Sequence, residues 1–275
     1  MPLDLRGGFE THWTRAGHGP RAALMIHCSL GHAGGWAGVT AALDDMISAV
    51  AYDLPGHGRS ADWDARGDLQ QVSMAMAADL LDDLVGGPAD IIGHSFGGTV
   101  ALRLAVERPD LVRSLTLIEP VFFAVGLHDR PDLAPRYAAQ MQGYSEALAA
   151  GDMAAAARAF TSVWGDGRVW ERLPEGQRQA LAQRIHLIEA GAPAILGDGA
   201  GMLASGALER IAVPVLLIEG GASPEYIDAI NAGLARRIPD TERAVVEGAG
   251  HMVPLTHVAA VAGHLRRFLE RVPAG

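Results

Sequence analysis

Two residues that together can cleave an acyl bond occupy well-marked positions in this sequence. Ser95 lies at the centre of Gly93-His-Ser-Phe-Gly97, and His251 lies in Gly248-Ala-Gly-His-Met. A neutral imidazole can take the proton of a serine hydroxyl as the oxygen attacks a carbonyl carbon, and can then return that proton to the leaving group. The pair therefore predicts catalysis by a serine nucleophile with a histidine general base.

The Gly-x-Ser-x-Gly segment places its serine on a sharp turn between an expected strand and an expected helix. Such a turn holds the serine in a strained backbone conformation with its hydroxyl exposed. Gly93 and Gly97 are expected because side chains two residues before and after the serine would collide across the turn. The start of the helix also directs the backbone N–H of Phe96 toward a developing oxyanion.

Two further segments follow earlier expected strands. They are His27-Cys-Ser-Leu-Gly31 and Asp53-Leu-Pro-Gly-His-Gly-Arg-Ser60. With them, the chain outside residues 120–210 resembles the α/β-hydrolase superfamily. Its members carry a His-Gly loop, an Asp-x-Pro-Gly-x-Gly-x-Ser turn, a serine elbow and a Gly-x-Gly-His loop in this order. The resemblance implies a serine hydrolase whose second oxyanion donor is the N–H of Ser29, with His27 and the 53–60 turn bracing that loop.

The first departure from the family pattern is Cys28, which replaces the usual glycine after His27. A cysteine nucleophile is one interpretation. The alternative, a small buried cysteine, is favoured because Ser95 already fills the nucleophile position. The β-carbon at a glycine position leaves the backbone conformation of the oxyanion loop open.

The second departure concerns the acid that orients the histidine. Family members commonly carry an aspartate shortly after the seventh strand, but the corresponding position here is Ser223. Serine cannot supply the negative charge that stabilises imidazolium. Glu119 is the preferred acid, because it ends the strand beside the nucleophile strand and resembles the acid position of some haloalkane dehalogenases. A cap or salt-bridge role is the alternative for Glu119; Glu225 and Asp228 are weaker candidates, and Glu219 is expected to fall short.

Strand-like runs alternate with helical patterns along most of the chain, which predicts an α/β fold with a mostly parallel twisted sheet and helices on both faces. Expected strands cover residues 9–15, 22–27, 47–53, 90–93, 111–119, 213–219 and 242–247, and expected helices cover 71–85, 98–108 and 258–271. Between residues 120 and 210 the alternation ends and helical, alanine-rich patterns take over. We therefore expect a core of residues 1–119 and 211–275 with an inserted helical cap at 120–210.

Seven of the fifteen aromatic residues fall in this expected cap. They are Phe122, Phe123, Tyr137, Tyr144, Phe160, Trp164 and Trp170. They could simply pack a small helical core, or some could line an apolar pocket above the catalytic residues. For substrate binding we predict Phe122, Phe123, Trp164 and Met252.

The composition narrows the range of partners. A net charge of −10 argues against nucleic acid and anionic membranes, and no apolar run is long enough to span a bilayer. The start of the sequence does not resemble a signal peptide, so the cytoplasm is the expected location. All 22 basic residues are arginine, which excludes lysine Schiff-base chemistry and a P-loop lysine. We expect no cofactor, and no metal despite His27, His32 and His57.

The preferred function is hydrolysis of a small or medium apolar ester or lactone through an acyl-enzyme on Ser95. One alternative is hydrolysis of a carbon–carbon bond in a vinylogous diketone, and another is a non-catalytic ligand-binding member of the fold. Dehalogenation and epoxide opening are disfavoured because they use aspartate at the nucleophile position. The physiological substrate and the oligomeric state stay open.

Overall fold

A computed structural model describes residues 3–273 and contains one eight-stranded sheet. The strands lie in the order β1-β2-β4-β3-β5-β6-β7-β8. From β4 to β8 neighbouring strands are parallel, whereas β1 pairs with β2 and β2 pairs with β4 in antiparallel orientation. The strands are β1 (Leu3–Arg6), β2 (Phe9–Ala16), β3 (Arg21–Ile26), β4 (Ile47–Tyr52), β5 (Ala89–His94), β6 (Val112–Ile118), β7 (Val215–Gly220) and β8 (Thr241–Val246).

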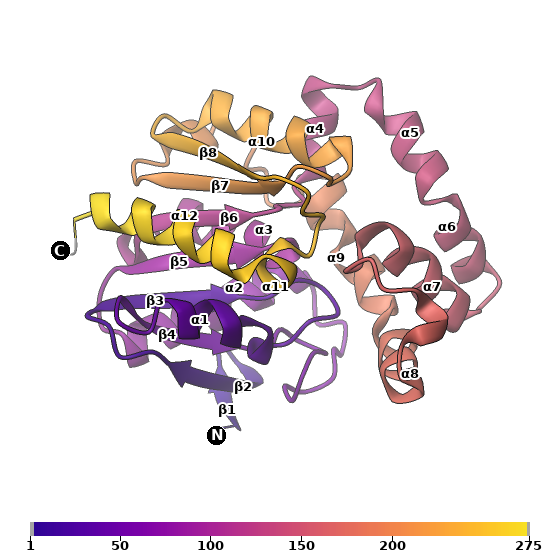
Figure 1. Ribbon diagram of the computed structural model, residues 1–275, viewed down its shortest axis with the longest axis horizontal. Helices are drawn as coiled ribbons and strands as arrows, with labels where there is room; N and C mark the ends of the chain where they lie inside the picture. The colour runs from indigo at the N-terminus through magenta and orange to yellow at the C-terminus, as the bar shows by residue number, and fades with distance from the viewer. Residues whose placement is uncertain (1–2, 274–275) are drawn as a thin grey trace.

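Helices cover both faces of this sheet and enclose two hydrophobic cores (Figure 1). One core includes side chains from α1, α12 and the residues beside them: Trp36, Leu43, Leu265 and Phe268. Helices α2, α3 and α10 contribute side chains to the other core. These helices are α1 (Ala37–Ala42), α2 (Leu69–Leu84), α3 (Phe96–Glu107), α10 (Glu225–Arg237), α11 (Val253–Thr256) and α12 (Val258–Arg271). Buried strands that are rich in β-branched and other aliphatic residues, with helices on both faces, are typical of a mostly parallel sheet.

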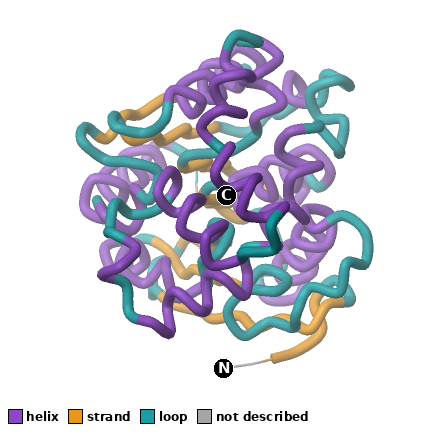
Figure 2. The backbone as a smooth tube through the Cα atoms, turned by 90° about the vertical axis from the view of Figure 1, so that its right-hand side faces the viewer, coloured by secondary structure: helices purple, strands orange, loops and turns teal. Residues whose placement is uncertain are grey.

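The chain between β6 and β7 forms only helices and loops (Figure 1). In Figure 2, which views the molecule from the side where these helices lie, helix predominates. The helices of this segment are α4 (Phe123–Asp129), α5 (Leu133–Gln140), α6 (Gln142–Ala149), α7 (Met153–Trp164), α8 (Glu175–Arg184) and α9 (His186–Leu196). Short 3-10 helices occur at Ala33–Trp36, Pro109–Leu111, Trp170–Arg172 and Leu208–Arg210.

The predicted fold class is confirmed, with differences in detail. The expected strands at 9–15 and 22–27 both form, as β2 and β3, and β4 lies between them in the sheet. Within the segment of residues 120–210, expected to be helical, the chain from Glu175 to Leu196 forms two helices, α8 and α9, which are divided at Ile185. Strand β1 was not predicted, since its four residues Leu3–Arg6 are too short to give a clear pattern. Among residues 3–273, no helix is long and apolar enough to cross a bilayer.

Candidate active site

Ser95 stands on the turn between β5 and α3. Its φ of 55° lies in the left-handed region, which is strained for a residue with a side chain. A β-carbon on Gly93 would meet the carbonyl oxygen of Gly97 at 2.4 Å, and one on Gly97 would meet that of Ile26 at 2.3 Å. The two glycines therefore allow the close approach of strand, turn and helix that presents the serine hydroxyl.

His251, from the loop after β8, joins Ser95 to Glu119. The Ser95 Oγ lies 2.9 Å from His251 Nε2, and His251 Nδ1 lies 3.0 Å from Glu119 Oε2. All three side chains are buried. A carboxylate only accepts hydrogen bonds, so Nδ1 carries the imidazole proton and Nε2 accepts the serine O–H. This is the arrangement in which an imidazole is ready to take the serine proton.

Glu119 follows β6, which lies between β5 and β7 in the sheet. Its φ of 51° is again left-handed, and its backbone N–H donates to the carbonyl oxygen of Ile218. The carboxylate also accepts the backbone N–H of Gly220 at 2.5 Å and the hydroxyl of Ser223, which lies 2.9 Å from each carboxylate oxygen. The serine that stands at the usual acid position thus donates a hydrogen bond to the acid that replaces it.

The other acidic side chains near this end of the sheet have different partners. Glu219 contacts Asn231 and Arg243. Asp228 pairs with the same Arg243, and Glu225 pairs with an arginine of α5. Of the candidate acids named from the sequence, Glu119 is the one that the structure places against His251.

The loop after β3 borders the nucleophile. Ser29 and Phe96 line one cavity together with Ser95 and His251. Leu30 has a φ of 62°, so the left-handed residue of this loop is two positions beyond Cys28. Burial raises the pKa of the Cys28 thiol to about 12, which keeps it protonated and weakly nucleophilic at neutral pH. The interpretation of Cys28 as a small buried side chain fits these surroundings better than a nucleophilic role.

His27 and His57 connect the oxyanion loop reciprocally to the loop after β4. His27 Nε2 accepts the N–H of Leu54 at 3.0 Å, while His57 Nε2 accepts the N–H of Leu30 at 3.0 Å. Each ring donates its Nδ1–H to a backbone carbonyl of its own loop. Asp53 adds a further tie by accepting the N–H of Ala33. Both rings must be neutral to accept these bonds.

Replacement of His57 by phenylalanine is expected to lower kcat by about tenfold to a hundredfold, less than the loss of an oxyanion donor itself. The reason is that the N–H of Leu30 loses its acceptor and the neighbouring Ser29 is held less firmly. KM is expected to change little. His57→Gln keeps a carbonyl acceptor and is expected to retain more activity. Steady-state kinetics test this prediction. Equal kcat values in both variants and in the wild type would show that the bond from Leu30 to His57 does not hold the oxyanion loop in place.

His94, the residue before the nucleophile, contacts the other end of the site. Its Nε2–H donates to the backbone carbonyl of His251 at 2.9 Å. The two rings lie 5.3 Å apart between centroids. His94 thereby ties the histidine loop to the elbow, a role not predicted from the sequence. The only feature of the sequence that singles out His94 is its position directly before Ser95 in the Gly-x-Ser-x-Gly motif.

Stability is expected to fall as the pH drops from about 6.5 toward 4. Burial lowers the pKa of His27 to about 4 and that of His57 and His94 to about 3, all below the value of about 6.5 in an unfolded chain. In this window the unfolded state binds about three more protons through these residues, so the unfolding free energy decreases with decreasing pH.

Urea unfolding at pH 7, 6 and 5 measures this dependence. His94→Gln is expected to reduce the proton uptake near pH 5 by about one. The buried Asp53 and Asp90 do not account for the effect. Burial raises their pKa, but hydrogen bonds to both carboxylates, and for Asp90 the neighbouring Arg113 and Arg21, lower it further, so they lose stabilising charge only below about pH 3.8. A constant unfolding free energy between pH 7 and 5 would show that these imidazoles are not held neutral.

Two cavities lie at this end of the sheet: the inner cavity borders Ser95 and His251, and the outer cavity borders the neighbouring oxyanion loop. The inner cavity, about 40 Å³, is lined by Ser29, Ser95, Phe96, Val121, Phe123, Tyr137, Phe160, Trp164, Ile188, Gly191, Ile195 and His251. The outer cavity, about 210 Å³, is lined by residues 28–32, Phe160, Thr161, Trp164, Gly165, Asp166, Arg168, Leu173, Gln177, Leu181, Met252 and Leu255. Most of the walls come from the helical segment between β6 and β7.

The predicted substrate-binding residues are distributed unevenly around these cavities. Phe123 lines the inner cavity, Met252 the outer one, and Trp164 both. Phe122 is a correction: its side chain is fully buried in the hydrophobic core and lines neither cavity. The neighbours Val121 and Phe123 face the inner cavity, which leaves Phe122 on the core side of the turn before α4.

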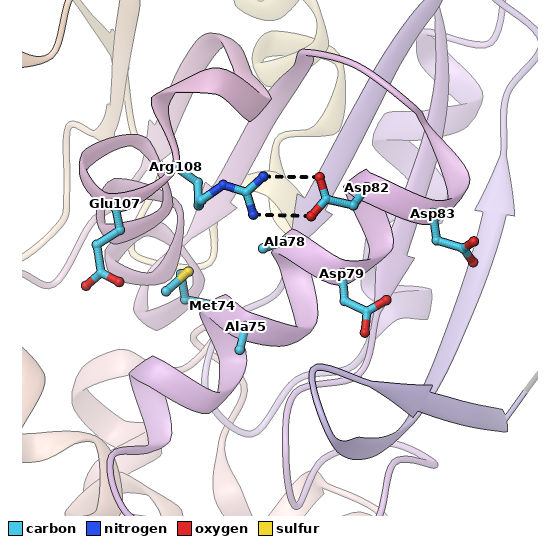
Figure 3. Close-up of a pocket in the computed structure, with 8 residues that line it drawn as sticks. All are labelled: Met74, Ala75, Ala78, Asp79, Asp82, Asp83, Glu107 and Arg108. Atoms are coloured by element: carbon cyan, nitrogen blue, oxygen red, sulfur yellow. Dashed lines mark hydrogen bonds and ion pairs between the residues drawn. The ribbon is translucent and has the colours of Figure 1, made fainter.

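A wide hollow of about 710 Å³ lies elsewhere, against α2 and the end of α3 (Figure 3). Its acidic side chains have basic partners: Arg108 binds Asp82, and Arg6 binds Asp79 and Asp83. It contains neither Ser95 nor His251. Among residues 3–273, no group of three or more histidine, cysteine, aspartate or glutamate side chains is arranged to hold a metal ion.

This fold agrees with the comparison of the chain with known proteins. The Alpha/beta hydrolase family matches residues 23–264, which is most of the sequence, so the chain belongs to that family and is a hydrolase. It is similar to the pimeloyl-[acyl-carrier protein] methyl ester esterase of Neisseria meningitidis, with 30% identity over 254 residues covering 86% of this chain and 90% of the esterase. It is also similar to lipase LipV of Mycobacterium tuberculosis, with 30% identity over 270 residues covering 94% and 98%.

Solved structures show the same fold. Cfl2 from Burkholderia cenocepacia superimposes with a TM-score of 0.77 at 22% identity, covering 97% of this chain and 94% of that one. The enol-lactonase from Burkholderia xenovorans superimposes with a TM-score of 0.71 at 22% identity, covering 98% and 100%.

Proposed function

We propose that this hydrolase cleaves a small or medium apolar ester or lactone through an acyl-enzyme on Ser95. The observation that carries the proposal is the continuous hydrogen-bonded chain from Glu119 through His251 to Ser95, with separations of 3.0 and 2.9 Å. Nucleophile, base and orienting acid in this order are the requirement for activating a serine hydroxyl at neutral pH.

In the first step the Ser95 hydroxyl gives its proton to Nε2 of His251 as Oγ bonds to the carbonyl carbon. The carbonyl oxygen becomes an oxyanion, which accepts hydrogen bonds from the N–H groups of Ser29 and Phe96. The C–O bond of the ester then breaks, and Nε2 returns the proton to the departing alcohol. The products of this step are a free alcohol and an acyl group on Ser95.

In the second step a water molecule gives a proton to Nε2 and attacks the acyl carbon. The resulting tetrahedral intermediate collapses, Ser95 recovers its proton, and the acid is released. In both steps Glu119 holds Nδ1 of His251 protonated and stabilises the imidazolium charge. A buried carboxylate is effective in this role because little solvent screens it.

The names of the relatives support an ester or lactone as the substrate. They include a methyl ester esterase, a lipase and an enol-lactonase. The walls of the inner cavity support an apolar group, since Val121, Phe123, Ile188 and Ile195 are all apolar. Small-molecule sites of this kind combine apolar walls with a few polar groups at the reacting atoms.

We further propose that residues 120–210 act as a cap on a core made of residues 1–119 and 211–275. Support comes from the helices and loops that make up this segment, which contains no strand, and from its side chains in both cavities. Trp164 lies against the catalytic imidazole, with its ring centroid 4.9 Å from that of His251. A cap in this position would exclude water from the reacting atoms.

A fluorophosphonate probe tests this proposed function. We expect one phosphonyl group per chain on Ser95, no labelling of Ser95→Ala, and turnover of p-nitrophenyl esters by the wild type. Labelling that persists in Ser95→Ala would contradict the assignment of the nucleophile. Faster cleavage of a dienoic ring-fission product than of any ester would replace ester hydrolysis by carbon–carbon bond hydrolysis.

A further inference from the structure

The inner cavity, which contains the reacting atoms of Ser95 and His251, shares a wall with the outer cavity. Ser29, Phe160 and Trp164 line both. A carbonyl group attacked by Ser95 and bound by the N–H of Ser29 lies in the inner cavity beside this shared wall. Its two substituents therefore extend in different directions, one into each cavity.

The order of the two chemical steps assigns each substituent to a cavity. The alcohol leaves and water enters while the acyl group is still bonded to Ser95. None of the residues that line the inner cavity is exposed, whereas Arg168 and Leu255 of the outer cavity are exposed, Leu255 by 45%. The outer cavity thus offers the path to solvent, so it takes the alcohol, and the inner cavity retains the acyl group.

The two cavities differ in size and polarity. A volume of about 40 Å³ holds about three water-sized groups, at roughly 10–15 Å³ for each. The outer cavity is about five times larger, at 210 Å³. It also contains Asp166, Arg168 and Gln177, and the guanidinium of Arg168 is neutralised by Asp166 at 2.6 Å. Because Asp166 already neutralises Arg168, a neutral hydroxyl or amide group on the alcohol suits this surface better than an anionic group.

From these cavities, and resting on the proposed function, we infer that the substrate is an ester of a short acyl group, two to four carbons long, with a larger neutral polar alcohol. Ile188 lines the inner cavity alone, where the acyl group is retained, and Leu181 lines the outer cavity alone, on the alcohol side. This distribution of size is the reverse of that in the methyl ester of pimeloyl-[acyl-carrier protein], which the name of the Neisseria relative gives as its substrate.

The test compares p-nitrophenyl acetate, butanoate and octanoate. In the wild type we expect kcat/KM to be about tenfold or more lower for octanoate than for butanoate, because extra methylenes do not fit. Ile188→Ala enlarges the inner cavity alone and is expected to shift the preference toward octanoate. Leu181→Ala is the matched control: it removes a similar side chain from the outer cavity alone and should keep the wild-type order of the three esters.

A second comparison tests the alcohol side with acetate esters of ethanol and of glycerol. The glycerol ester is expected to have the higher kcat/KM in the wild type, by about tenfold. A preference of the wild type for octanoate, a better ethyl ester, or a change of acyl preference in Leu181→Ala but not in Ile188→Ala would overturn the inference.

These outcomes are separate from failure of the proposed function. If Ser95 is labelled and esters are turned over with the longest acyl group preferred, the inference is wrong while the proposed function stands. If no ester is hydrolysed and Ser95 is not labelled, both are overturned. Circular dichroism and thermal unfolding of both alanine variants establish that they are folded before their kinetics are compared.

Discussion

Replacement of Glu119 by glutamine is expected to lower kcat by about 10³- to 10⁴-fold, as removal of the charge of a triad acid does elsewhere. Glutamine keeps the shape of the side chain but cannot compensate the imidazolium charge. Its amide can also donate to Nδ1 of His251, which favours the wrong tautomer for accepting the serine proton. Steady-state kinetics on the best ester measure the loss, and a decrease of less than tenfold would place the acid elsewhere.

Ser223 provides a sharp control for this result. Its hydroxyl lies 2.9 Å from both carboxylate oxygens of Glu119, so an aspartate at this position would bring a carboxylate into the same region. The double variant Glu119→Gln, Ser223→Asp is expected to regain about tenfold or more of the lost kcat. Ser223→Ala alone removes one hydrogen bond to a charged acceptor and is expected to cost about tenfold. No recovery in the double variant would show that the charge acts only from position 119.

Replacement of Ser95 by alanine is expected to have a larger effect still, a decrease in kcat of about 10⁶-fold, comparable with the loss of the nucleophile in a serine protease. The oxyanion loop and both cavities do not depend on the hydroxyl, so substrate binding should persist. Isothermal titration with a non-hydrolysable ester analogue measures that binding. More than about 1% of the wild-type kcat, beyond any contaminating wild-type enzyme, would contradict a covalent role for Ser95.

The parts of the site that could be predicted are those with local motifs. Ser95 needs a glycine on either side at fixed spacing because the turn leaves no space for β-carbons, and this requirement is visible in the sequence. His251 follows the last strand in a short Gly-x-Gly-His loop. Glu119 could be predicted because a serine at position 223 shows that the usual acid is missing and that another carboxylate must replace it. The sheet order, with β6 next to β5, then brings Glu119 to His251.

The parts that could not be predicted depend on how helices pack. Trp164 reaches the imidazole of His251 only because α7 folds over the end of the sheet, and no local pattern encodes that position. Phe122 was assigned to the pocket on composition alone, but the turn before α4 places it in the core. The resemblance predicts that His27 and the 53–60 turn brace the oxyanion loop, but the reciprocal bonds of His27 and His57 depend on how the loops after β3 and β4 meet.

The most direct test of the central claim is the mass of the protein during turnover. Wild type mixed with p-nitrophenyl butanoate and quenched in acid within milliseconds is expected to show a burst of about one equivalent of p-nitrophenol and the added mass of one butanoyl group, located by peptide mapping on Ser95. Absence of the adduct under conditions of rapid turnover, or its location on Cys28 or any other residue, would contradict an acyl-enzyme on Ser95.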